Sequence, residues 1–174
     1  MRPALLRSSL ILCLALALGA CGFKLRGAFT LPYQSLHIGL PANSPLGADL
    51  RRQIRANQPG LLVDDPKKAE AVFQQVGEKR ERIIAAMNAE GRAREYQLRL
   101  RYSFRLVDGK GTPLTPVNEI ILAREVTYDD NQVLAKNQEE EFLWQSMQQD
   151  LAQQILRRLT ARQALPPPVE EEDN

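Results

Sequence analysis

The clearest pattern in the chain is a strict alternation of apolar and polar residues over positions 96–106. A period of two residues is typical of a strand with one buried face, so this segment predicts a long strand. Its apolar face holds Tyr96, Leu98, Leu100, Tyr102, Phe104 and Leu106, and its other face holds Gln97, Arg99, Arg101, Ser103 and Arg105. We expect the first face to lie in the core and the second to contact water or a polar partner.

Three further segments predict strands. Residues 35–40 alternate Leu, Ile and Leu with polar or small residues, and residues 69–86 are rich in Val, Ile and Phe without a helical stripe. Residues 117–128 place Ile120, Leu122, Val126 and Tyr128 on one side. Before this segment, Asp108-Gly109-Lys110-Gly111 indicates a hairpin, because Asp-Gly tolerates the positive φ that such turns require.

Two segments predict helices. In the first, Ser44 can cap and Pro45 suits the first helical position, and Gln58-Pro59-Gly60 then ends the helix. The second helix covers residues 137–164, and its acidic run Glu139-Glu140-Glu141 would lie at the favourable end of the helix dipole. The expected buried positions are Leu46, Leu50 and Ile54 in the first helix, and Leu143, Met147, Leu151, Ile155 and Leu159, widened by Phe142 and Leu156, in the second.

The order β, α, β, β, β, α predicts one α+β domain over residues 35–164. We expect two helices packed on one face of a four-stranded sheet that is mixed but mostly antiparallel. The connection from Leu40 through the first helix would make one strand pair parallel. The predicted core combines the two periods and contains Leu98, Leu100, Phe104, Leu143, Met147, Leu151 and Ile155.

The N-terminus predicts secretion and lipid attachment. Residues 1–20 have two arginines, a short apolar run and small residues, as in a signal peptide, and the run is too short to span a bilayer. Leu18-Gly19-Ala20-Cys21 resembles the bacterial lipobox, which implies cleavage before Cys21 and acyl chains on that residue. An ordinary secretory signal with a chance cysteine is the alternative. Gly22, where retained lipoproteins carry Asp, implies an anchor in the outer membrane, on its periplasmic side.

The ends of the mature chain are expected to lie outside the domain. Residues 21–34 lack a period and predict a lipidated linker, and residues 165–174 follow three prolines and predict a disordered acidic tail. Loss of Arg2 and Arg7 with the signal lowers the 23 basic residues to 21, equal to the 21 acidic ones. A neutral chain offers no general attraction to nucleic acid, so we expect no nucleic-acid partner.

The residues offer little for catalysis. Cys13 leaves with the signal and Cys21 carries lipid, so no disulfide is expected. The single histidine, His37, alternates with apolar residues on a predicted strand and is expected at the surface rather than as a base. No spacing resembles a metal site or a phosphate loop, so we expect no metal, no cofactor and no enzymatic activity. An anchored hydrolase, the competing class, would need a base and nucleophile pair that we do not find.

Basic residues gather near one predicted turn. Lys79, Arg80 and Arg82 precede Gly91-Arg92-Ala93-Arg94, and pairing of residues 69–86 with 93–106 would place these cations around a projecting tip. A solvated polar surface and an anion-binding surface remain equal interpretations. At an outer membrane the prominent phosphorylated amphiphile is lipopolysaccharide, whose phosphates suit Arg and Lys.

Several motifs resemble one family, the LPS-assembly lipoproteins called LptE. They are Cys21-Gly22-Phe23-Lys24-Leu25-Arg26-Gly27, Glu95-Tyr96-Gln97-Leu98, and Asp130-Asn131 followed by Leu134-Ala135-Lys136. The resemblance implies two helices on a four-stranded sheet, and a non-enzymatic lipoprotein that plugs the LptD β-barrel, assists its assembly and takes part in lipopolysaccharide transport.

The same resemblance implies site residues for lipopolysaccharide. It identifies Lys136 with one basic residue that the family uses, whereas the other falls on Ala89, so that Arg92 or Arg94 would have to take its place. The competing hypothesis is an accessory lipoprotein of another envelope machine, such as outer-membrane protein insertion.

Overall fold

The structure is a computed structural model that describes residues 29–129 and 132–161 of the 174. Its elements are the strands β1 (Leu36–Gly39), β2 (Ala71–Met87), β3 (Ala93–Val107) and β4 (Asn118–Thr127), the helices α2 (Pro45–Asn57) and α3 (Val133–Thr160), and the short 3₁₀ helix η1 (Pro66–Lys68). The predicted signal peptide, the anchor at Cys21 and the acidic tail lie outside the described residues.

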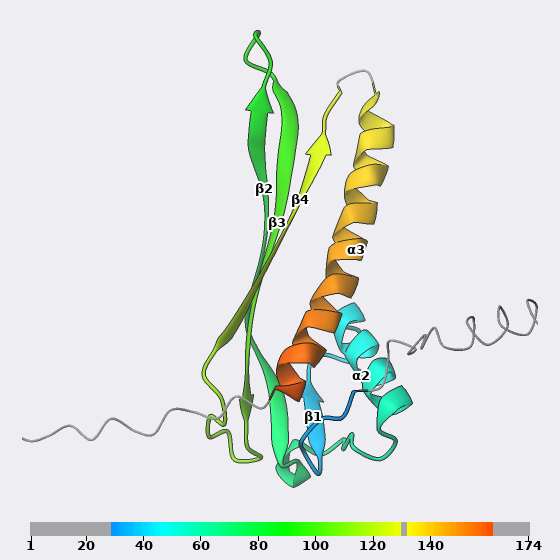
Figure 1. Ribbon diagram of the computed structural model, residues 1–174, viewed down its shortest axis with the longest axis vertical. Helices are drawn as coiled ribbons and strands as arrows, with labels where there is room; N and C mark the ends of the chain where they lie inside the picture. The colour runs from blue at the N-terminus through cyan, green and yellow to red at the C-terminus, as the bar shows by residue number, and fades with distance from the viewer. Residues whose placement is uncertain (1–28, 130–131, 162–174) are drawn as a thin grey trace, which may run out of the picture.

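The four strands form one sheet in the order β1-β2-β3-β4. The β1 strand pairs with β2 in parallel, and the β2–β3 and β3–β4 pairs are antiparallel. Both helices lie on the same side of the sheet, with α3 running along β4 and α2 beside β1 at the lower end (Figure 1). The predicted α+β fold with a mixed, mostly antiparallel sheet is therefore confirmed.

The core lies between the sheet and the helices, where the apolar face of β3 meets the apolar stripes of α2 and α3. From β3, Leu98, Leu100, Tyr102, Phe104 and Leu106 are all buried, as the alternation predicts. Facing them are the buried residues Met147, Leu151, Ala152, Ile155, Leu156 and Leu159 of α3 and Leu46, Leu50 and Ile54 of α2. Each fully buried Leu or Ile stabilises the fold by about 1.5–3 kcal/mol, so this layer holds the domain together.

Local signals explain the bounds of α2. The Ser44 hydroxyl accepts a hydrogen bond from the Gly47 amide at 3.1 Å, and Pro45 occupies the first helical position. The helix ends at Asn57, before Gln58. These features confirm the predicted start and end.

The helix α3 departs from the prediction at its start. It begins at Val133, four residues before the expected position 137, because Val133 to Lys136 offer no buried stripe to mark the first turn. Phe142 was expected to widen the buried stripe, but its side chain is 71% exposed. That prediction is wrong: Phe142 lies beside the stripe on the solvent side, and Leu143 is only partly buried.

The segment 29–34, within the predicted linker, contacts the domain. Leu31 is buried, and its backbone N–H donates to the Gln58 side chain at 2.6 Å. The Tyr33 hydroxyl donates to the Leu159 carbonyl at 3.4 Å. Phe29 and Tyr33 also pack against the core, so Phe29, Leu31 and Tyr33 form a short alternation that the predicted linker overlooked.

The turn after β3 uses its glycines differently from the prediction. The Asp108 carboxylate accepts hydrogen bonds from the Lys110 and Thr112 amides, each at 2.8 Å, and these bonds lower the pKa of Asp108. The positive φ belongs to Gly111, at 93°, rather than to Gly109. Gly109 serves a close approach instead, because a Cβ there would lie 2.9 Å from the Lys67 carbonyl oxygen.

A buried hydroxyl in the core generates the first prediction. Within residues 29–129 and 132–161, the Tyr102 hydroxyl has no hydrogen-bond partner, and burial raises its pKa. Because Tyr102→Phe removes an unsatisfied polar group, we expect the free energy of unfolding in urea to stay equal or to rise by about 1–3 kcal/mol. Leu100→Asp, on the same face of β3, should abolish cooperative unfolding.

Because the pKa of Tyr102 is raised, the stabilities of the wild type and of Tyr102→Phe should also depend differently on pH. The fold favours the neutral phenol, so that the unfolded state ionises first as pH rises past the ordinary Tyr value of about 10. The wild type should lose stability above that pH more steeply than Tyr102→Phe. A Tyr102→Phe protein less stable than the wild type at neutral pH would show that the hydroxyl has a stabilising partner.

Candidate functional site

The three cations predicted to contact lipopolysaccharide lie at one end of the molecule. Arg92 and Arg94 belong to the hairpin between β2 and β3, and Lys136 lies in the first turn of α3. Both the hairpin tip and the start of α3 lie at the upper end in Figure 1. The antiparallel pairing of β2 with β3 places the tip there, as the sequence predicts.

The tip has a defined turn. The Asn88 backbone N–H donates to the Arg92 carbonyl at 2.9 Å, and the Asn88 side chain accepts from the Arg92 amide at 2.8 Å. Gly91 has a φ of 76°, a conformation that favours glycine. The turn therefore presents Arg92 and Arg94, which are both exposed, on a hydrogen-bonded scaffold.

Backbone pairing connects the tip to Lys136. The Tyr128 amide donates to the Arg94 carbonyl at 2.8 Å, which extends the β3–β4 pairing beyond Thr127. The Lys136 ammonium donates to the Thr127 hydroxyl at 2.8 Å and forms an ion pair of the same length with Glu139. Lys136 is only 19% exposed at its side chain, so a ligand must compete with Glu139 to reach it.

The acidic run of α3 has a role other than the one predicted. Because the helix begins at Val133, its first turn contains no acidic residue, and the helix dipole does not explain Glu139-Glu140-Glu141. Glu139 pairs with Lys136, and Glu140 forms an ion pair with Arg82 of β2 at 3.4 Å. Glu139 therefore balances a cation of α3 itself, and Glu140 balances one that reaches the helix from β2.

The sequence predicts that Arg82 lies near the tip, but it does not predict which residues surround the guanidinium. Its guanidinium lies 3.8 Å from the centre of the Tyr96 ring and 5.6 Å from that of Tyr128. These two rings meet edge to face at 5.5 Å. We call Arg82, Tyr96, Tyr128 and Glu140 the Arg82 clasp, because it joins β2, β3, the end of β4 and α3.

A β-bulge turns Arg82 toward the helix. The register between β2 and β3 shifts between Gln75 and Gly77, so that Arg80 and Arg82 lie opposite Leu100 and Leu98 and share their helix-facing side. Arg80 accordingly lies 5.7 Å from the Trp144 ring of α3. The sequence signal for these contacts is the presence of Tyr and Trp on the neighbouring elements. A search for aromatic residues that could lie beside Arg80 and Arg82 could have found them.

The opposite face of the sheet carries no helix among the described elements (Figure 1). Arg99, Arg101 and Arg105 lie on this open face, as the alternation predicts, but each has a partner. Arg101 pairs with Glu119 at 3.3 Å, Arg105 donates to Gln74 at 2.7 Å, and Arg99 donates to Gln97 at 2.8 Å. The open face is therefore mixed in charge rather than strongly cationic, and it also exposes Ile83 and Ile121.

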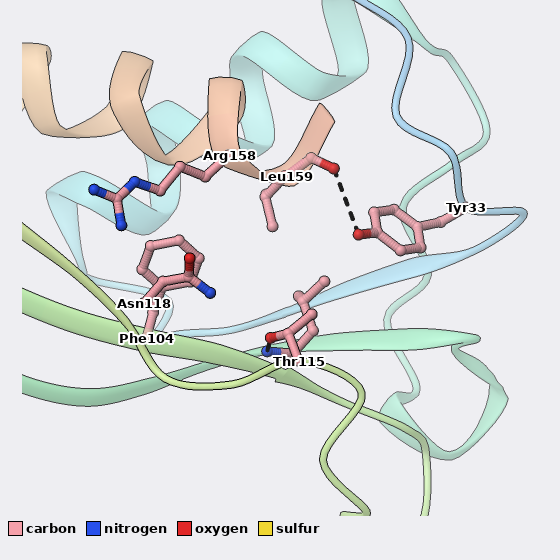
Figure 2. A pocket seen from close by; sticks show the side chains of 7 residues that line it. Tyr33, Phe104, Thr115, Asn118, Arg158 and Leu159 are labelled. Atoms are coloured by element: carbon pink, nitrogen blue, oxygen red, sulfur yellow. Dashed lines mark hydrogen bonds between the residues drawn. The ribbon is translucent and has the colours of Figure 1, made fainter. Parts of the chain in front are cut away.

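A small pocket at the lower end offers no ligand site. Figure 2 shows its lining, which includes Tyr33, Phe104, Thr115, Asn118 and Arg158. Its volume of about 10 Å³ matches a single water-sized sphere. The Thr115 hydroxyl there accepts from the Leu106 amide at 3.0 Å, which secures the loop before β4.

The described residues show no group of metal ligands. His37 is half-buried, with Nδ1 3.0 Å from the Val63 carbonyl. Across residues 29–129 and 132–161, no group of His, Cys, Asp and Glu side chains could hold a metal ion. In the same ranges, no helix has the length and apolar character needed to cross a membrane.

Comparisons with known proteins agree on one family. A family model described as "LptE: Lipopolysaccharide-assembly" matches residues 33–159. The LPS-assembly lipoprotein LptE of Yersinia enterocolitica is 29% identical over 158 residues, which cover 86% of this chain and 74% of that protein.

Solved structures extend the similarity to the fold. The NMR structure of an uncharacterized lipoprotein B from Nitrosomonas europaea matches with a TM-score of 0.67 and 40% identity, over 80% of this chain and 91% of the other. The crystal structure of a minor lipoprotein from Acinetobacter baumannii matches with a TM-score of 0.61 and 31% identity, over 76% and 94%.

The Arg82 clasp generates the second prediction. Arg82→Gln removes both the ring contacts and the ion pair with Glu140, so we expect the free energy of unfolding in urea to fall by about 1–2 kcal/mol. The matched control is Arg80→Gln, which should cost less because Arg80 lies farther from its ring and pairs with Glu78 on its own strand. Equal stabilities of the wild type and Arg82→Gln would contradict a structural role for the clasp.

Proposed function

This chain belongs to the LptE family of lipopolysaccharide-assembly lipoproteins, and on that premise we propose that it plugs and helps assemble the LptD β-barrel. It takes part there in lipopolysaccharide transport to the outer leaflet and acts without catalysis. The family match over residues 33–159 carries this proposal. We further propose that Cys21 anchors the chain in the outer membrane, on its periplasmic side.

The one-sided sheet supports a role as a plug. An open face of paired Arg, Lys, Glu and Gln side chains suits a hydrated barrel lumen, whose wall is polar on the inside. We propose that this face meets the barrel, while α2 and α3 supply the rigid support behind it. The mixed charge favours a wall that also carries both signs.

The upper end supports contact with lipopolysaccharide. We propose that Arg92, Arg94 and Lys136 bind its phosphates, since Arg and Lys form charge-assisted hydrogen bonds with phosphate oxygens. Lys136 would exchange its carboxylate partner Glu139 for a phosphate. Desolvated contacts of this kind contribute about 1.5–3 kcal/mol each, against about 0–1 kcal/mol for exposed pairs.

The partner is tested by affinity capture of the full chain from Gram-negative envelopes. We expect a tagged chain to retain LptD, with partners identified by mass spectrometry. Recovery of the outer-membrane protein insertion machinery instead of LptD would favour the competing hypothesis of an accessory lipoprotein for that machine.

The anchor is tested by substitution of Cys21. Cys21→Ala should give a chain that stays unprocessed or leaves the membrane fraction, because the thioether-linked lipid can no longer form. Intact mass of the wild type should show acyl chains on Cys21. A wild-type mature chain without lipid, by mass or by detergent partition, would contradict the anchor.

The lipopolysaccharide contact is tested by charge reversal. The triple variant Arg92→Glu, Arg94→Glu and Lys136→Glu should bind lipopolysaccharide more weakly than the wild type at moderate salt and should still associate with LptD. Glu139→Gln should act in the opposite direction, because it frees Lys136 from its ion pair.

A matched control reverses the charge of three exposed arginines that do not lie at the tip. Arg52, Arg55 and Arg157, changed together to Glu, alter the net charge by the same amount but lie on α2 and in the last turn of α3. Equal weakening by the two triple variants would reduce the effect to general charge, and unchanged binding in the tip variant would show that its cations are a solvated rim.

A further inference from the structure

The contacts between β2 and α3 follow a regular order toward the upper end of the molecule. On the helix-facing side of β2, Arg80 lies 5.7 Å from the centre of the Trp144 ring, and Arg82 pairs with Glu140 at 3.4 Å. Two strand residues advance about 6.6 Å and four helix residues about 6 Å, so the two elements keep the same pace. The next residue of β2 on this side is Ile84.

Val133 lies on the same stripe of α3 as Trp144. It precedes Trp144 by eleven residues, which is about three helical turns, so the two residues share one face of the helix. The Lys136 ammonium reaches the Thr127 hydroxyl, so this first turn of α3 lies beside the end of β4. Ile84 and Val133 therefore both lie on the inner side of their elements, where the sheet and the helix face each other.

Both apolar side chains are nevertheless exposed. Ile84 is 46% exposed and Val133 is 40% exposed. Leu98 and Leu100, which lie lower on the same side of the sheet, are buried. Figure 1 shows that the β2–β3 hairpin and α3 diverge toward the upper end. The helix therefore leaves this part of the sheet uncovered.

Aromatic rings adjoin Ile84. Tyr96 lies directly opposite Ile84 in the strand pair and is half-buried, and its ring meets the Tyr128 ring edge to face at 5.5 Å. We call Ile84, Tyr96, Tyr128 and Val133 the upper apolar surface. Aromatic rings and branched aliphatic side chains present mainly carbon atoms, so this surface suits a hydrocarbon chain.

Cations border the upper apolar surface. Arg94 is exposed and precedes Tyr96 by two residues, so it lies on the same side of β3. Arg92 lies in the adjoining turn, and Lys136 shares the first turn of α3 with Val133. The arrangement matches an amphiphile, in which an anionic head group and a hydrocarbon chain belong to one molecule.

We propose that an acyl chain of lipopolysaccharide lies against the upper apolar surface, between the hairpin and the first turns of α3. This inference rests on the proposed contact of Arg92, Arg94 and Lys136 with the phosphates, and it adds the place where the apolar part of the same molecule binds. An acyl chain that covers Ile84 and Val133 removes their apolar area from water, which phosphate contacts alone do not. The surface thereby distinguishes lipopolysaccharide from a soluble sugar phosphate.

Two neighbouring residues supply matched controls. Ile83 is 38% exposed but pairs with Gln97, so it lies on the open face. Leu134 is 77% exposed and lies about 100° around the helix axis from Val133. Each control is as apolar as its neighbour and differs from it in direction. A lipid bilayer that merely covered the upper end would contact Ile84, Val133 and both controls alike.

The first experiment maps the contact by photo-cross-linking of the full chain in Gram-negative envelopes. A benzophenone amino acid replaces Ile84, Val133, Ile83 or Leu134, one at a time, and adducts are detected with an antibody against lipopolysaccharide. We expect strong adducts at Ile84 and Val133 and weak ones at the two controls. Equal adducts at all four positions would overturn the proposal in favour of general bilayer contact. Stronger adducts at the controls, or none at any position, would overturn it as well.

A binding experiment separates the acyl contact from the phosphate contact. The ligands are lipopolysaccharide and the same lipopolysaccharide after alkaline removal of its acyl chains, and an amphipathic polymer keeps the full chain soluble. Ile84→Ser combined with Val133→Ser should weaken binding of the intact ligand by roughly tenfold and leave binding of the deacylated ligand unchanged. Ile83→Ser combined with Leu134→Ser should change neither.

The charge-reversal variant distinguishes failure of this inference from failure of the proposed function. Arg92→Glu, Arg94→Glu and Lys136→Glu together should weaken binding of both ligands. If that variant loses both ligands while Ile84→Ser with Val133→Ser loses neither, the phosphate contact stands and the acyl contact is overturned. If the wild type binds neither ligand, the proposed contact with lipopolysaccharide fails, and this inference fails with it.

Discussion

The burial of one face of β3 beneath the two helices is the constraint on which the other features depend. The β3 strand lies between β2 and β4, and its alternate apolar residues supply the middle of the core. Only one side of the sheet is covered by the described helices, so the polar positions of β3 must face outward. The sheet therefore has an apolar side beneath the helices, an open side opposite, and two outer edges.

The bulge in β2 divides the helix-facing side into two parts. Below it, Phe73 points into the apolar core; above it, Arg80 and Arg82 point toward α3. The upper half of α3 is consequently held by cation, aromatic and carboxylate contacts, whereas the lower half is held by apolar packing. The cations proposed to bind lipopolysaccharide lie at the polar end, where Glu139 already balances Lys136.

Sequence reasoning predicted the elements that a repeating pattern marks. The alternation in β3 and the spacing of Leu46, Leu50 and Ile54 fixed the core, since burial imposes both periods. The start of α3 and the exposure of Phe142 escaped prediction because neither follows from a stripe. The Arg82 clasp escaped it because a one-residue bulge reverses the facing of residues 77–84 in β2, and nothing in the local pattern marks the bulge.

The most direct test of the proposed plug is to compare carboxylate labelling of the free chain with that of its complex with LptD. Glu119 and Glu125 lie on the open face of β4, and Glu141 lies exposed on α3. If the open face meets the barrel, labelling of Glu119 and Glu125 should fall in the complex more than labelling of Glu141. A fall at Glu141 with unchanged labelling at Glu119 and Glu125 would show that the helices, rather than the open face, meet the barrel.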